Sequence, residues 1–369
     1  MKVIFKKEDL VKALDIVQRA AQNKVTSNTN NGIYIKAAGS TAEFQANDYS
    51  IAIKTSCSAS VEEEGDIVTA SPQLPVMIRL LPGSEVIMEQ KKGEGFVTFR
   101  SERAVYHFPI RNPDDFPMVE VMENADGASV KAKVLSEMVN LTQYAAATDR
   151  QKPFFTGILF EIRGNSFAMA ATNTHRLAAK ESTLEEDATA PGRMIVPAQV
   201  MTEVVRMLPQ GEDDVVRMTW AKSHIAFTFG DTYFISTLIS GEYPDYHRVI
   251  PQRFDTTAVL NLKAFRDAVS MVAPISRDMS YKTINFNFSD GMLDIYEEDK
   301  AIGSSRTSIP AQIEGDPIHI VFNCFYVEDI LKHSGGETVT LHLMKNGPML
   351  VEQEEDKTYQ YVVTPMRGR

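Results

Sequence analysis

Leu81-Pro82-Gly83 is followed by the strand-like run Glu85-Val86-Ile87-Met88. The same order, a helix breaker and then a β-prone run, returns twice further along the chain. The two counterparts are Leu208-Pro209-Gln210-Gly211 before Asp214-Val215-Val216-Arg217, and His333-Ser334-Gly335-Gly336 before Glu337-Thr338-Val339-Thr340-Leu341. Pro lacks the amide donor that a helix needs, and Gly accepts the left-handed conformation that often follows a helix end. Each copy therefore predicts a helix, a stop and a strand.

The beginnings and ends of these copies also match. Helical spacing joins Leu10, Leu14 and Val17 after the strand-like Phe5, and it returns after Leu260 at Phe265, Val269 and Val272. Leu135, Met138 and Val139 form a looser middle copy. Asp115-Phe116-Pro117 and Glu242-Tyr243-Pro244 close the first two copies. A period near one third of the 369 residues predicts three homologous α+β domains, 1–122, 123–249 and 250–369, each with two helices on antiparallel strands.

Composition is that of a globular protein, with 43% hydrophobic and 24% charged residues. The net charge of −11, from 38 basic and 49 acidic residues, argues at first sight against a nucleic-acid binder, because such proteins usually present a basic surface to the phosphates. Cys57 and Cys324 are too few for a disulfide framework. The opening MKVIFKKEDL has no apolar stretch, and no run of about 18 apolar residues follows, so we expect neither a signal peptide nor a membrane span. These features predict a reduced, cytoplasmic protein.

The motifs of common catalytic and cofactor sites are missing. The sequence has no phosphate-binding loop, no dinucleotide fingerprint, no nucleophile elbow and no Cys/His set with metal-ligand spacing. Acidic runs such as Glu62-Glu63-Glu64 are typical of solvated loops. We therefore expect no catalytic residue, no metal site and no cofactor.

The segment Ala171-Thr172-Asn173-Thr174-His175-Arg176-Leu177-Ala178 is unusual because polar residues interrupt two apolar runs. Phe167–Ala171 is predicted to be a buried strand, Thr172–Thr174 a tight turn, and Arg176–Ala178 the start of the return strand. Taken alone, the segment could be an ordinary hairpin.

Four segments resemble one family. Thr172-Asn173-Thr174-His175-Arg176-Leu177 resembles the T-D-G-H-R-L signature of the bacterial replication sliding clamp, the beta subunit of DNA polymerase III. Tyr361-Val362-Val363-Thr364-Pro365-Met366-Arg367 resembles its closing motif. Asn112–Pro117 and Tyr243–Val249 resemble its two inter-domain junctions. Length and period also match, so the resemblance extends over the whole chain.

The resemblance implies a fold and a function without catalysis. Such chains dimerise head to tail into a closed ring of six similar domains, with an outer belt of sheets around helices that line a hole. The ring encircles duplex DNA without reading sequence. It tethers the replicative polymerase and other replication and repair proteins, and so confers processivity. The chain would thus be the processivity subunit, while polymerase activity resides in another subunit.

The resemblance also implies a pocket for partner peptides between the second and third domains. The family's pocket takes short peptides that begin with Gln and end in Leu or Phe, from the polymerase, the clamp loader and repair proteins. The matching positions are Phe155, Thr172, Thr174, His175, Arg176, Leu177, Pro244, Arg248, Val249, Val362, Val363, Pro365, Met366 and Arg367. Phe155 stands where the family commonly has Leu, and Asn173-Thr174 replaces Asp-Gly or Asp-Ser, so we expect a narrower pocket and an altered turn.

Two further surfaces are implied. DNA contact is expected at basic residues of the inner helices and adjacent loops, namely Lys12, Lys24, Arg79, Lys152 and Arg206. The segments that would line the hole carry a formal charge of +8, which leaves −19 for the remainder of the chain. Such a distribution would favour DNA only inside the ring. The dimer interface is expected to join Tyr106 and Phe108 on an edge strand to Met271 on a helix.

Two alternatives remain open from the sequence. The three repeats could form a protein-interaction scaffold that has no DNA function. A hydrolase that uses His175 and an acidic cluster is the weaker alternative.

Overall fold

The computed structural model describes residues 1–21, 32–69, 72–149 and 151–366. Two compact units contain them. The first unit consists of Met1–Lys133, Ala188–Ala190 and Thr202–Leu238. The second consists of Val134–Asp187, Pro191–Met201 and Ile239–Arg369. Lys24 and Arg367, two of the expected site residues, lie outside the described residues.

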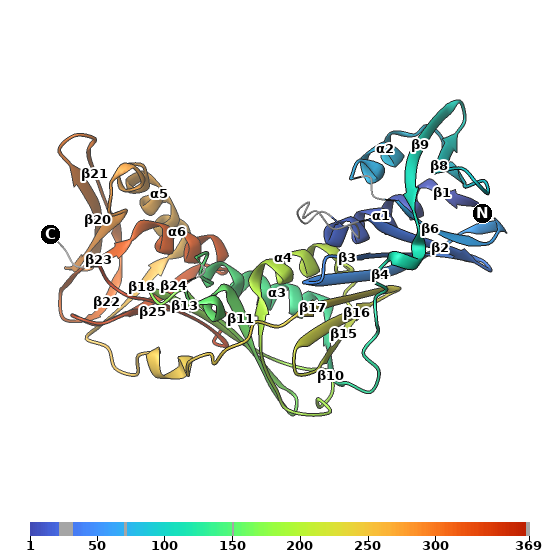
Figure 1. Cartoon of the computed structure of the whole chain (residues 1–369). Helices are drawn as coiled ribbons and strands as arrows, with labels where there is room; N and C mark the ends of the chain where they lie inside the picture. Colours follow the sequence, from blue (N-terminus) through green and yellow to red (C-terminus); the bar gives the residue numbers. More distant parts are fainter. Residues whose placement is uncertain (22–31, 70–71, 150, 367–369) are drawn as a thin grey trace. The chain divides into compact units, whose positions relative to one another are not determined.

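The first unit is built on one antiparallel sheet of 13 strands. In spatial order they are β10 (Asp126–Lys131), β15 (Val215–Trp220), β16 (His224–Phe229), β17 (Thr232–Thr237), β4 (Ile51–Ser58), β3 (Thr41–Asn47), β2 (Ile33–Ala38), β6 (Gly65–Thr69), β9 (Ala104–Arg111), β8 (Phe96–Ser101), β7 (Glu85–Glu89), β1 (Lys2–Lys6) and β5 (Ser60–Glu63). The sheet continues from the first repeat into the second because β4 pairs with β17. Helix α1 (Lys7–Ala21) packs on β3 and β4 beside α2 (Leu74–Leu80), as Figure 1 shows.

The second unit contains two antiparallel sheets. The nine-stranded sheet has the order β14 (Gly192–Pro197), β11 (Gly157–Arg163), β12 (Ser166–Thr172), β13 (Arg176–Thr183), β26 (Tyr359–Val363), β25 (Met349–Gln353), β24 (Thr338–Leu343), β18 (Thr256–Asn261) and β22 (Gln312–Gly315). The four-stranded sheet has the order β21 (Gly303–Pro310), β20 (Met292–Asp299), β19 (Thr283–Ser289) and β23 (Ile318–Asn323). Helices α5 (Leu262–Asp278) and α6 (Cys324–His333) pack against each other.

The expected fold class is confirmed, because each third of the sequence contributes two helices and several antiparallel strands. The middle third supplies α3 (Ala132–Thr142) and α4 (Ala198–Met207). The two compact units divide this middle third between them. The domain limits 1–122, 123–249 and 250–369 stay a prediction.

The helix stops differ in detail from the expectation. Gly83 and Gly336 take the left-handed conformation, with φ of 71° and 82°. Each stands two residues after the helix cap, which is Leu81 for α2 and Ser334 for α6. Gly211 has no positive φ; instead its amide donates to a carboxylate oxygen of Asp214 at 2.7 Å. Similar sequences therefore end these helices with different backbone conformations at the glycine.

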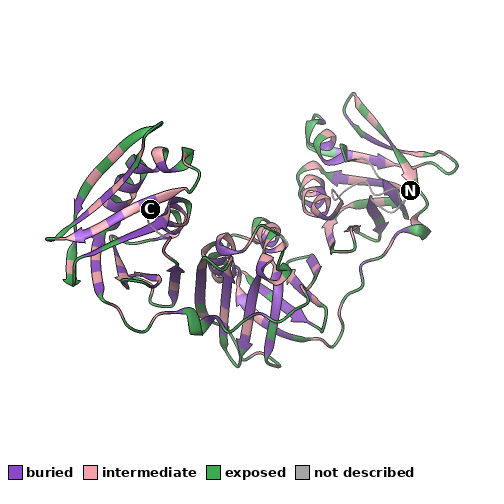
Figure 2. Ribbon diagram, turned by 60° about the vertical axis from the view of Figure 1, so that its left-hand side comes forward, coloured by how far each residue is buried: buried purple, intermediate pink, exposed green. Residues whose placement is uncertain are grey.

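The core lies between the helices and the sheets. Leu10, Leu14 and Val17 of α1 are fully buried, and Phe265 of α5 stacks edge-on against Phe286 of β19 at 5.6 Å. Figure 2 shows buried residues along the sheet faces beneath the helices, while the outer sides of the helices are exposed. Burial of each large apolar side chain contributes about 1.5–3 kcal/mol to the stability of the fold. The helical periodicity of apolar residues in the sequence therefore reflects this packing. Among the described residues, none of the helices combines the length and apolar character of a membrane span.

Leu14 tests this packing. Replacing the fully buried Leu14 by Ala should lower the free energy of unfolding by about 2–5 kcal/mol, because it removes apolar contacts and leaves a cavity. The measurement is urea denaturation followed by circular dichroism. Lys12→Ala, on the exposed side of the same helix, is the control and should change the free energy by less than about 0.5 kcal/mol. Equal losses in both variants would contradict the packing.

Candidate functional site

The turn between β12 and β13 is held by its own side chains. The hydroxyl of Thr172 accepts from the amide of Thr174 at 3.0 Å and donates to the carbonyl of Arg176 at 2.6 Å. The Oδ1 atom of Asn173 accepts from the amides of His175 and Arg176 at 3.0 and 3.1 Å. Thr174 has φ of 77°, a conformation that costs a β-branched residue more than it costs Gly. The expected turn is confirmed, and these hydrogen bonds offset the strain at Thr174.

A cavity of about 580 Å³ lies beside this turn. Its walls come from the turn, the start of β13, the chain around η4 (Tyr246–Val249), the loop after β24, and the end of β26. Its lining residues are Phe155, Thr172, Thr174, His175, Arg176, Leu177, Pro244, Asp245, Tyr246, Arg248, Val249, Ile250, Pro251, Met344, Pro348, Val362 and Thr364. Leu177, Tyr246 and Val362 are buried parts of one apolar cluster, whereas Val249 is 55% exposed at the rim. The cavity therefore combines an apolar floor with a polar rim.

Most of the residues expected to form a peptide pocket line this cavity. Ten of them do so, namely Phe155, Thr172, Thr174, His175, Arg176, Leu177, Pro244, Arg248, Val249 and Val362. Val363, Pro365 and Met366 do not. Val363 is fully buried, and the amide of Met366 donates to the carbonyl of Val321, which directs the chain end toward β23.

Sequence reasoning missed several lining residues. Tyr246 lies inside the junction motif and Ile250 directly follows it, so their apolar character was a usable signal. Met344 and Pro348 come from the loop between β24 and β25, which carries no motif. They reach the cavity only because β25 pairs with β26.

Arg176 connects the cavity to helix α6. Its side chain is only 9% exposed and forms an ion pair with Asp329 at 2.5 Å. The guanidinium also donates to the carbonyl of Tyr144 and lies 4.6 Å from the ring centre of Tyr326. Burial works against the charge, but Tyr361 and Asp329 outweigh it, so the pKa of Arg176 is raised above its ordinary value. Arg176 is therefore a fixed wall of the cavity.

The hydrolase alternative would need an acidic group paired with His175. His175 is exposed, and no carboxylate among the described residues is bonded to its imidazole. The described residues contain no cluster of three His, Cys, Asp or Glu that could hold a metal ion. Burial raises the pKa of Cys57 to about 12 and that of Cys324 to about 11, so neither thiol is a ready nucleophile near neutral pH.

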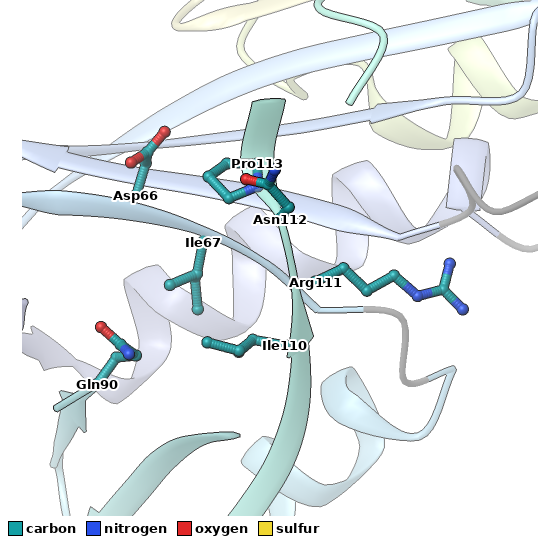
Figure 3. Close-up of a pocket in the computed structure, with 7 residues that line it drawn as sticks. All are labelled: Asp66, Ile67, Gln90, Ile110, Arg111, Asn112 and Pro113. Atoms are coloured by element: carbon teal, nitrogen blue, oxygen red, sulfur yellow. The ribbon is translucent and has the colours of Figure 1, made fainter. Parts of the chain in front are cut away.

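Another cavity, of about 340 Å³, lies in the first unit where β9 leaves β6 (Figure 3). It is lined by Asp66, Ile67, Gln90, Ile110, Arg111, Asn112 and Pro113. In Figure 3 the side chains of Ile67 and Ile110 lie close together, while the guanidinium of Arg111 points away from them. None of these lining residues is among those expected at a functional site.

The residues expected to contact DNA have different surroundings. Arg79 is paired with both carboxylate oxygens of Asp15, at 2.6 and 2.7 Å, and Arg206 is paired with Glu203 at 2.8 Å. Lys12 is exposed on α1, and no described carboxylate pairs with it. The ammonium of Lys152 lies 5.7 Å from the ring centre of Phe155. Acidic neighbours thus weaken the positive field of the two arginines.

The residues expected at a dimer interface also differ from one another. Residues 104–109 of β9 pair only with β8, so this half of the strand is an open edge among the described residues. Tyr106 is half-buried on that edge, and Met271 is 62% exposed on α5. Phe108 is 3% exposed and packs on Phe99 at 5.7 Å, so its ring belongs to the core of this unit.

Family models of the DNA polymerase III beta subunit match the chain in order along its length. The N-terminal domain matches residues 1–120, the central domain 129–245 and the C-terminal domain 247–367. This chain belongs to the DNA polymerase III beta subunit family. The resemblance seen in the sequence is thereby confirmed, and the family is one of processivity factors rather than catalytic enzymes.

Curated relatives in this family are named beta sliding clamps. The protein of Chlamydia muridarum is 24% identical over 368 residues, which cover 100% of this chain and 99% of the relative. Those of Synechococcus elongatus and Staphylococcus aureus (strain Mu50) are each 25% identical over 379 residues, covering 100% of this chain and 100% and 99% of the relatives.

Solved sliding clamps have the same fold. The clamp of Bacillus subtilis superposes with a TM-score of 0.95 at 23% identity, and that of Pseudomonas aeruginosa bound to griselimycin with 0.94 at 25%. In both comparisons the match covers 100% of this chain and 100% of the other. Together with the family models and the curated relatives, these structures support the sliding-clamp interpretation over the hydrolase and the scaffold without DNA.

Arg176→Met should lower the free energy of unfolding by about 1–3 kcal/mol, because Asp329 and the carbonyl of Tyr144 lose a charged donor in a largely buried place. The measurement is again urea denaturation. Arg248→Met is the matched control, since Arg248 lines the same cavity but its side chain is 85% exposed. If Arg248→Met lowered the free energy of unfolding as much as Arg176→Met, the contacts of Arg176 with Asp329 and Tyr144 would not be a special source of stability.

Proposed function

We propose that two copies of this chain close into a ring around duplex DNA and hold the replicative polymerase on its template. The full-length match to the three beta-subunit domains, in order, carries this proposal. A ring holds DNA by enclosure, so tight phosphate contacts are unnecessary and would slow sliding. We propose the cytoplasm as its location.

Open strand edges support the dimer. Among the described residues, the part of β9 that pairs only with β8 carries Tyr106, while β21 ends the four-stranded sheet and packs on α5, which carries Met271. Edge strands present unsatisfied amide and carbonyl groups, which pair readily with an edge of another chain. In the head-to-tail arrangement, β9 of one copy would meet the β21 side of the other.

The DNA-facing role is assigned to Lys12, Lys24, Arg79, Lys152 and Arg206. The ion pairs of Arg79 and Arg206 with acidic neighbours support weak contacts, which let the ring move along the phosphates. The large acidic excess elsewhere on the chain disfavours binding of DNA to the outer surface.

The cavity beside the Thr172–Arg176 turn is proposed to bind the peptides of polymerase, clamp loader and repair proteins. An apolar floor suits Leu and Phe side chains, and the polar rim suits a leading Gln. The chain of Pseudomonas aeruginosa was solved with griselimycin, and the fold of that chain matches this one over its full length. Val363, Pro365 and Met366 remain proposed members of the pocket, and so does Arg367, which lies outside the described residues.

Retention on DNA tests the ring. After loading by the cognate clamp loader, the chain should stay on nicked circular DNA and leave within minutes once a restriction enzyme makes the circle linear, because only closure holds it. Gel filtration of labelled protein measures retention. A linear DNA with streptavidin at both ends is the control and should keep the chain. Equal retention on open linear and circular DNA would refute enclosure, and absence from both would favour a scaffold without DNA.

Val249→Asp tests the peptide cavity. A fluorescent pentapeptide that begins with Gln and ends in Leu-Phe should bind about tenfold more weakly or worse, because the variant places a charge on an apolar wall. Fluorescence anisotropy measures the dissociation constant. Val215→Asp is the control, since Val215 is comparably exposed at 46% but does not line the cavity. Unchanged affinity in Val249→Asp would refute the assignment.

A further inference from the structure

A cavity of about 380 Å³ in the first unit lies beside the start of β4. Its walls are the turn before β4, the linker 118–122, and the facing ends of β16 and β17. Each of these three parts has a counterpart around the peptide cavity of the second unit. We call it the β4 cavity.

The turn before β4 and the turn between β12 and β13 are held by the same pattern of hydrogen bonds. The Oδ1 atom of Asp48 accepts from the amides of Ser50 and Ile51 at 2.9 and 2.7 Å, as Asn173 does in its own turn. The Oδ1 atom of Asn47 accepts from the amide of Tyr49 at 2.8 Å, as Thr172 does for Thr174. Tyr49 has φ of 67°, matching the left-handed conformation of Thr174.

The strand pairing is also repeated. Ile51 faces Ser236 across β4 and β17, just as Arg176 faces Val363 across β13 and β26. The last amide of β17 and the first amide after β26 each donate a hydrogen bond to a carbonyl of the neighbouring turn. Thr237 donates to the carbonyl of Ser50 at 2.9 Å, and its counterpart Thr364 donates to that of His175 at 2.9 Å.

The linker forms a preformed wall. The amide of Val119 donates to Oε1 of the buried Gln45 at 2.8 Å, and that of Met122 donates to the hydroxyl of Tyr233 at 3.0 Å. Asn47 donates to the carbonyl of Pro117 at 3.1 Å. Pro117 opens this linker as Pro244 opens the chain beside the peptide cavity. A ligand would therefore meet an ordered groove, which lowers the entropy cost of binding.

Apolar side chains stay exposed around the β4 cavity. Tyr49 is 71% exposed, Val121 51% and Met118 47%, although all three line one cavity. Its floor includes Ala52 and Val119, which belong to a small buried cluster. Exposed apolar groups that converge on one groove mark binding surfaces more often than scattered ones do.

The charges, however, are different. At the counterparts of Arg176 and Arg248, the β4 cavity has Ile51 and Val121, so two cations of the peptide cavity are replaced by apolar groups. At the counterpart of His247 it has Glu120, which is exposed and has no ion-pair partner among the described residues. The same scaffold therefore presents an apolar groove with a negative edge.

We propose that the β4 cavity binds a short extended segment of a partner protein that carries two adjacent apolar side chains and a neighbouring Lys or Arg. The volume lies within the range of ligand pockets, about 300–1,000 Å³. The apolar pair fills the groove between Tyr49 and the linker, and the cation lies at Glu120. This partner class differs from that of the peptide cavity because the carboxylate of Glu120 has no ion-pair partner among the described residues, whereas Arg248 of the peptide cavity is paired with Asp245.

Methyl NMR can test the two cavities separately. Met118 and Met122 line the β4 cavity, and Met344 lines the peptide cavity. The full-length chain is labelled with ¹³C-methyl methionine, and Met→Leu variants assign these signals. One probe is a pool of capped pentapeptides with adjacent Leu or Phe residues beside one Lys; the matched pool has Glu in place of Lys.

The Lys pool should shift the Met118 and Met122 signals in a saturable way, and the Glu pool should bind at least several-fold more weakly. Glu120→Gln should weaken the Lys pool about threefold, as expected for an exposed ion pair. Glu120→Lys should reverse the preference. Tyr49→Asn, which suits the left-handed conformation, should reduce binding of both pools because it removes the aromatic wall.

Several results would overturn the proposal. They are the absence of a saturable shift at Met118 and Met122, equal binding of the two pools, and an unchanged preference in Glu120→Lys. The Gln-led peptide should shift Met344 in every variant. Loss of that response alone would count against the proposed peptide function and leave the inference about the β4 cavity standing.

Discussion

Backbone pairing between one repeat and the closing strand of the next is the interaction on which both units depend. β4 would be an open edge of the first repeat without β17, and β13 would be an open edge of the second without β26. An open edge leaves amide and carbonyl groups without partners and invites wrong associations. Closing each edge from the neighbouring repeat removes this liability and extends one sheet across two repeats. It also brings a turn, a linker and a strand end together, so a cavity forms beside each seam.

The turns at the two seams show how one backbone serves different chemistry. In both, an Asx or Thr side chain caps the next amides, and a residue other than Gly occupies the left-handed region. Such a conformation costs about 1–3 kcal/mol, and the local hydrogen bonds offset it. Because the backbone is held in this way, the side chains at the turn are free to vary. Arg176 reaches α6 from one turn, whereas Ile51 remains part of an apolar wall at the other.

The positions of the charged residues say more about DNA binding than the net charge of the chain does. The net charge of −11 suggested a protein that avoids nucleic acid, yet the chain belongs to the sliding-clamp family. Arg79 and Arg206 are each paired with a carboxylate, so they offer a softened positive field rather than bare cations. In the proposed ring such a weak field would suffice, since a ring that holds DNA by enclosure needs only to avoid repelling it.

Sequence by itself determined the three repeats, the two helices in each and the hairpin at Thr172–Arg176. These features depend on local periodicity, on helix breakers and on short-range hydrogen bonding. Residues that are close together in the sequence determine all three. Leu14 and Phe265, for example, were identified as core positions from helical spacing alone. Ten of the expected pocket residues also line one cavity. The sequence could predict this because the family resemblance implied that these residues form one pocket.

Only the tertiary structure decided which side chains face a cavity and which are buried. Phe108 was expected at the dimer interface and Val363 in the peptide pocket, but the side chains of both residues are buried. Met344 and Pro348 enter the peptide cavity from a loop without any motif, and Glu120 lies at the β4 cavity through a linker held by Gln45 and Tyr233. These placements depend on contacts between residues far apart in the chain. No local pattern encodes them, because the register of distant strands is set by the packing of the whole sheet.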